Sequence, residues 1–232
     1  MKKTITGLLT AASLISTPLM ARDLDVEVTN LTHGIYFTPL LITAHAPDSH
    51  LFTVGTAASP NLQTMAEGGD ISGLSNDLAA IGANIVENPA GGLLAPGAST
   101  SAMLSTDTTN THLSLVGMLL PTNDGFVGLS ALEIPNTQGT YTYYLNAYDA
   151  GTEANDEIIN GGGMLGVPGI PADPGGHSGT NGTGVTTTEI NTMVHIHRGV
   201  LGDTDPDGGI SDLNSRVHRW LNPIAKLVIT VK

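Results

Sequence analysis

The stretch GFVGLSALEIPNTQGTYTYYLNAYD, residues 125–149, contains two strand-like runs in succession. The second run alternates, with Tyr143, Leu145 and Ala147 on one side, as a β-strand with one buried face does. Two neighbouring runs of this kind predict a β-hairpin. The start of its first strand and the end of its second would then meet at one edge of a sheet.

Strand-like runs recur along the whole chain. With 29 glycines, 13 prolines and 12% charged residues, the composition favours many turns between them. Short helices are expected after the N-cap residue Ser59 and after Ser75. The sequence therefore predicts an all-β fold, an antiparallel sandwich with few and short helices. The nine runs are residues 24–28, 34–45, 51–55, 99–106, 112–119, 125–132, 140–148, 192–199 and 225–232.

Residues 1–21 resemble a secretory signal. Lys2 and Lys3 precede an apolar stretch broken by small and polar residues, and Ala21 lies where a signal peptidase would cut. We expect an exported protein, periplasmic or extracellular, with one domain over 22–232. Without the two lysines, the remaining six basic residues face 21 acidic ones, a net charge of −15. This charge argues against nucleic acid and anionic lipid as partners, and the broken apolar stretch argues against a membrane span.

The hairpin leads into an acidic turn, YDAGTEANDE, residues 148–157. Its carboxylates repel one another unless a cation lies among them. Asp124 precedes the first strand of the hairpin and Asp149 ends the second, so strand pairing would bring both close to Glu153. Calcium prefers carboxylate and carbonyl oxygens. The sequence predicts a calcium site with Asp124, Asp149 and Glu153 as ligands, and the alternative is a solvated acidic loop.

Two other patterns are candidate metal sites. In GDTDPDGGISDLN, residues 202–214, three aspartates alternate as in an EF-hand loop, but Asn214 stands where a bidentate acid is required. This segment is either a looser calcium loop or a turn rich in Asx residues. His195 and His197 alternate on a strand-like run, with His218 downstream, a spacing that also suits copper or zinc. We expect these histidines to be structural.

Residues 161–184 contain ten glycines and three prolines and directly follow the acidic turn. Such a composition predicts a long flexible loop outside the core, either a plain surface insertion or a flap beside a site.

Several segments together resemble the spondin N-terminal domain family. The D-x-F-V-G motif of that family stands at Asp124, Phe126, Val127 and Gly128, and its Y-D-A-G-T-[DE] motif at residues 148–153. The resemblance implies a sandwich of about eight strands, of the synaptotagmin type, with calcium at its loop end and Asp124, Asp149 and Glu153 as ligands. The cysteines of the animal relatives F-spondin and mindin are absent. The resembling segments are residues 26–59, 113–132, 144–157, 194–203 and 217–230.

These observations favour a secreted calcium-binding domain that acts in adhesion or matrix-type recognition of an extracellular protein or glycan. A periplasmic copper or zinc protein using His195 and His197 is the rival interpretation. A carbohydrate-active enzyme is a weaker one, since clustered carboxylates can serve as acid and base. The chain has no cysteine nucleophile and no G-x-S-x-G, H-E-x-x-H or phosphate-loop motif, so we expect no enzyme. The sequence does not define the oligomeric state.

Overall fold

The computed structural model describes residues 21–232, and the expected leader lies almost wholly outside this part. The described chain forms ten strands and two short helices, α1 (Pro60–Gly68) and α2 (Ser72–Ala80), which confirms the all-β expectation. The strands are β1 (Asp23–Asn30), β2 (Tyr36–Phe37), β3 (Leu41–His45), β4 (Asn84–Glu87), β5 (Ser99–Ser105), β6 (His112–Leu120), β7 (Gly125–Glu133), β8 (Gly139–Asp149), β9 (His195–Ile196) and β10 (Ala225–Val231).

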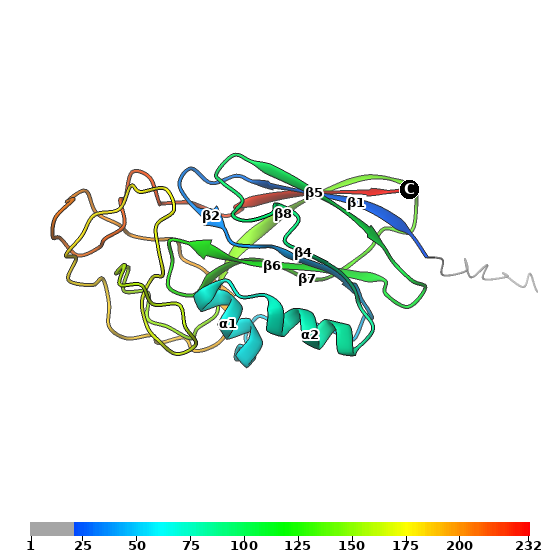
Figure 1. The fold of residues 1–232 in the computed structure, drawn as a ribbon, viewed down its shortest axis with the longest axis horizontal. Helices are drawn as coiled ribbons and strands as arrows, with labels where there is room; N and C mark the ends of the chain where they lie inside the picture. Colours follow the sequence, from blue (N-terminus) through cyan, green and yellow to red (C-terminus); the bar gives the residue numbers. More distant parts are fainter. Residues whose placement is uncertain (1–20) are drawn as a thin grey trace, which may run out of the picture.

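Eight strands follow one antiparallel path in the order β4-β3-β6-β7-β8-β10-β1-β5, and the two-residue strands β2 and β9 pair with β6 and β8. The long strand β8 belongs to both layers of this sandwich. Its residues 139–145 pair with β10, and its residues 146–149 pair with β7. The layers lie face to face, as Figure 1 shows, because β8 passes from one to the other.

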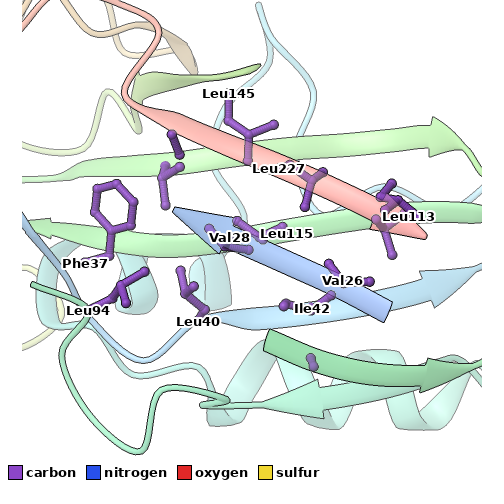
Figure 2. Close-up of a cluster of buried hydrophobic side chains, with 14 of the residues drawn as sticks. Val26, Val28, Phe37, Leu40, Ile42, Leu94, Leu113, Leu115, Leu145 and Leu227 are labelled. Carbon is purple, nitrogen blue, oxygen red and sulfur yellow. The ribbon is translucent and has the colours of Figure 1, made fainter. Parts of the chain in front are cut away.

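The main core lies between the layers. On β1 the side chains of Leu24, Val26 and Val28 are buried, whereas Asp25 and Glu27 alternate toward solvent. Figure 2 shows Val26 and Val28 of β1 among Ile42 of β3, Leu113 and Leu115 of β6, and Leu227 of β10. Each such side chain stabilises the fold by about 1.5–3 kcal/mol through burial.

A second core lies between the helices and the outer face of β3, β6 and β7. Leu62 and Met65 of α1 pack with Val116 and Met118 of β6, so that β6 is covered on both faces. The first helix begins as expected, because Ser59 Oγ accepts a hydrogen bond from the Leu62 amide at 3.2 Å. The second begins earlier than expected, at Ser72, which places Ser75 inside the helix.

Three strand expectations are wrong in detail. Residues 51–55 form no strand, because Leu51 and Phe52 are buried against the second core as part of a loop. The run 34–45 is divided into β2 and β3, and only two residues of 192–199 form a strand. No strand-like run predicts β4, which pairs with β3 after the second helix.

Residues 150–222 contain no helix and only the short strand β9. They form the yellow and orange loops at one end of the sandwich in Figure 1. The glycine-rich segment 161–184 lies there, outside the two large cores, as expected. Its Ile170 is nevertheless buried in a small cluster with Val200 and Leu213. The flexibility of the rest of this segment stays a prediction.

Candidate metal site at the loop end

The β6–β7 turn and the end of β8 place Asp124 beside Asp149, as the hairpin predicts. Gly125 and Asp149 are partners in the β7–β8 ladder, and the amide of Ala150 donates a hydrogen bond to the Asp124 carbonyl at 3.2 Å. Both carboxyl groups are buried, at 0% and 1% exposed. The two aspartates thus meet where the sandwich gives way to the long loops.

The carboxyl group of Asp124 has one occupied and one free oxygen. Its Oδ2 accepts hydrogen bonds from the backbone amides of Thr152 (2.8 Å) and Glu153 (3.1 Å) and from Thr152 Oγ1 (3.1 Å). Its Oδ1 is buried and has no hydrogen-bond partner among the described residues. A buried acceptor without a partner costs free energy, so this oxygen marks a place where a ligand or a proton would stabilise the protein.

Asp149 shares its two oxygens between neighbours in the turn. Oδ1 accepts a hydrogen bond from the Gly151 amide at 2.8 Å, and Oδ2 accepts one from Asn155 Nδ2 at 2.7 Å. His195 Nδ1 lies 3.8 Å from Oδ1, close enough for an ion pair when the imidazole is protonated. The side chain is therefore fixed in position beside Asp124.

Electrostatics make this pair costly when both groups are ionised. Burial, and then the charge of the neighbouring Asp149, raise the pKa of Asp124 to about 8. Burial also raises the pKa of Asp149. Without a cation, at least one proton is therefore retained near neutral pH.

The third expected ligand, Glu153, is buried but directed elsewhere. Its Oε2 accepts a hydrogen bond from the Gly169 amide at 3.0 Å, and its Oε1 is buried without a partner. Burial raises the pKa of Glu153 to about 7, and the nearby charges that add to this rise are those of Glu67 and Asp156. Among residues 21–232, no group of three or more His, Asp or Glu side chains is arranged to hold a metal ion. The structure brings two of the three predicted ligands together.

Glu157, at the end of the acidic turn, has a role that the sequence did not suggest. It is 2% exposed, with Oε1 accepting a hydrogen bond from the Leu201 amide (2.6 Å) and Oε2 accepting from the Gly202 amide (2.8 Å) and Ser211 Oγ (2.6 Å). These partners lie 44 to 54 residues away in the chain. Glu157 therefore ties the acidic turn to the distant loops, and no local pattern could have indicated it.

The aspartate-rich loop 203–214 is held by its own backbone. Asp203 Oδ2 accepts hydrogen bonds from the amides of Ile210 (2.8 Å) and Ser211 (3.0 Å), and Oδ1 accepts one from Asp205 (2.9 Å). These hydrogen bonds lower the pKa of Asp203, and the one from the Ile210 amide has the largest effect. This is the geometry of an Asx-rich turn.

The histidines are engaged in local packing. Burial lowers the pKa of His197 to about 3, its Nδ1 accepts a hydrogen bond from the Gly199 amide (3.0 Å), and its ring centroid lies 5.1 Å from that of Trp220. His195 is partly exposed and its Nδ1 lies 2.8 Å from the Met193 carbonyl. The buried His218 accepts a hydrogen bond from the Asn214 amide at Nδ1 (3.0 Å).

Comparison with family models decides the relationship of the chain. The model of the spondin N-terminal domain (Spondin_N) matches residues 29–157, more than half of the sequence. The chain belongs to this family. Comparison with curated proteins gave no match.

The match runs from the end of β1 through β8 to the end of the acidic turn and includes Asp124, Asp149 and Glu153. The glycine-rich segment, both strand histidines and the loop 203–214 lie beyond it. Within the family motif, Gly128 leaves space for two aromatic rings. A Cβ atom there would lie 2.7 Å from the Phe52 ring and 2.9 Å from that of Tyr148.

No helix of residues 21–232 is sufficiently long and apolar to cross a lipid bilayer.

Proposed function

We propose that this spondin-type domain binds calcium at the Asp124–Asp149 pair and acts outside the cytoplasm as a recognition module. One observation carries the proposal: a buried carboxyl oxygen without a partner, Asp124 Oδ1, beside a second buried carboxyl group. Two buried carboxylates are unstable together, and a divalent cation reverses the sign of their interaction.

The chemistry of the donors suits calcium. Carboxylate and backbone oxygens are hard ligands, and a turn supplies them with the irregular geometry that calcium tolerates and magnesium does not. Asp124 and Asp149 would supply charged oxygens to the ion. Glu153 would act indirectly. It accepts a hydrogen bond from the Gly169 amide and so would hold that part of the loop in place. A bound ion would supply positive charge and fix the acidic turn against the sandwich.

A recognition role follows from where the site lies. A rigid sandwich carries long loops at one end, the arrangement by which many binding domains present variable surfaces. Calcium at the base of these loops would hold them in one conformation for a protein or glycan partner. The leader expected at residues 1–21 supports export to the calcium-containing exterior, and we assign the domain no catalytic step.

Calorimetric titration of the purified protein with calcium, magnesium, copper and zinc tests this function. We expect one calcium ion per chain, weaker binding of magnesium, and loss of the calcium signal in Asp149→Asn. Asp48→Asn, which removes an exposed carboxylate elsewhere, should bind calcium as the wild type does. Absence of calcium binding would overturn the proposal. Tight zinc binding that His195→Gln with His197→Gln abolishes would support the transition-metal interpretation.

A further inference from the structure

Two adjoining hollows flank His50 on the helix-covered side of the sandwich. Their volumes are about 360 and 330 Å³, within the usual size of small-molecule sites. Because both are lined by His50, they form one groove along the loop 49–54. The first is lined by His50, Phe52, Thr53, Val54, Leu129, Ser130 and Tyr148, and the second by Ser49, His50, Leu51, Ser59, Leu74, Asp77, Leu78 and Ile81.

The first hollow has a rigid aromatic floor. The ring centroid of Phe52 lies 5.1 Å from that of Phe126, edge to face, and 4.8 Å from that of Tyr148. Gly128 leaves the space that these rings occupy. Ser130 Oγ donates a hydrogen bond to the Phe52 carbonyl at 2.7 Å, which fixes the loop on strand β7. The floor is thus built into the sandwich before any ligand arrives.

Polar groups around this floor have no partners of their own. The imidazole of His50, the hydroxyl of Thr53 and the phenol of Tyr148 form no hydrogen bond with any of the described residues. These groups can both donate and accept. The hollow therefore offers apolar surface below and free hydrogen-bonding groups at its rim.

Charge narrows the class of ligand. The protein has a formal net charge of −13, yet no Asp, Glu, Lys or Arg lines the first hollow. A polyanion would be repelled by the surrounding protein, and a cation would find no carboxylate there. The second hollow has one carboxylate, Asp77, whose Oδ2 accepts a hydrogen bond from Asn61 Nδ2 at 2.6 Å. Its other oxygen is left to accept from a neutral hydroxyl group.

We propose that this groove binds a neutral oligosaccharide. One sugar ring would lay its apolar C–H face on Tyr148, Leu129 and Val54, with its hydroxyl groups toward His50 and Thr53. The next ring would enter the second hollow, where Asp77 accepts from a hydroxyl group. The inference rests on the recognition role proposed above and gives it a ligand class, but it does not use the calcium site.

Titration of the purified protein with neutral cello-, xylo- and chito-hexasaccharides, followed by calorimetry and NMR, tests the inference. A polyuronate and an aromatic peptide serve as competing probes. We expect a neutral hexasaccharide to bind, and His50→Ala and Tyr148→Phe each to weaken binding about five- to tenfold, the loss of one or two hydrogen bonds. His33→Ala, an exposed histidine outside the groove, should have no effect.

Binding should be the same in calcium and in EDTA, and unchanged in Asp149→Asn. A failure of calcium binding would therefore leave this result intact, and the reverse also holds. The inference is overturned if no neutral hexasaccharide binds, if the polyuronate or the peptide binds instead, if binding requires calcium, or if both groove variants bind as the wild type does.

Discussion

Replacing Asp124 with asparagine should stabilise the metal-free protein and make calcium ineffective. In the wild type, Asp124 Oδ2 accepts three hydrogen bonds, whereas Oδ1 has no partner. An asparagine can keep its oxygen at the Oδ2 position and place its amide at Oδ1. The amide can then donate toward Asp149 and removes one negative charge from the buried pair.

The size of the effect follows from the pKa of Asp124. Burial and the neighbouring Asp149 raise it to about 8, whereas an unfolded aspartate has a pKa of about 3.9. Between these values the folded state binds more protons than the unfolded state, so the free energy of unfolding falls as pH rises. At pH 7 the loss is on the order of 4 kcal/mol. Asparagine cannot ionise and avoids this loss, which corresponds to a rise in Tm on the order of 10 °C.

Thermal unfolding in EDTA from pH 4 to pH 8 measures this difference. The variant should exceed the wild type most at pH 8, and the difference should vanish near pH 4, where both side chains are neutral. Calcium at a hundredfold excess over Kd should stabilise the wild type by about 2.7 kcal/mol, and the variant hardly at all. Asp48→Asn should follow the wild type throughout. The reasoning fails if Asp124→Asn is the less stable protein in EDTA at pH 8.

Three further predictions concern the loops. Glu157→Ala should lower the free energy of unfolding by about 3 kcal/mol in denaturant titrations, because three donors, among them the buried Ser211 hydroxyl, lose their acceptor, while the exposed Glu133→Ala should change little; equal effects would show that Glu157 does not hold the loops together. His195→Gln with His197→Gln should leave copper and zinc affinity in calorimetry unchanged, and loss of stoichiometric binding would reverse the assignment. Limited proteolysis should cut first within 161–184 and leave two associated fragments; preferential cleavage elsewhere would show that the whole segment is packed.

The meeting of Asp124 and Asp149 was predictable because strand pairing alone produces it. Two alternating runs, each next to one aspartate, form a hairpin whose open end brings the aspartates together. Local sequence also defined the start of the first helix at Ser59 and the alternating burial on β1. In each case the determining interactions lie within a few residues or along one regular ladder.

Predictions failed where contacts between residues far apart in the sequence determine the local structure. The direction of the Glu153 side chain depends on the Gly169 amide, 16 residues further on, in a segment without regular structure. Residues 51–55 are rich in residues that favour strands, yet Phe52 lies on Phe126 and Tyr148, and Gly128 of β7 makes room for it. Neither contact leaves a periodic signal in the sequence.

A crystal structure of the protein grown with calcium tests the central claim most directly. The account predicts one strong anomalous peak beside Asp124 Oδ1, with oxygens of Asp124 and Asp149 at about 2.3–2.6 Å, the range of calcium–oxygen contacts. A structure in which this position holds no ion, or in which calcium occupies only the loop 203–214, would contradict it.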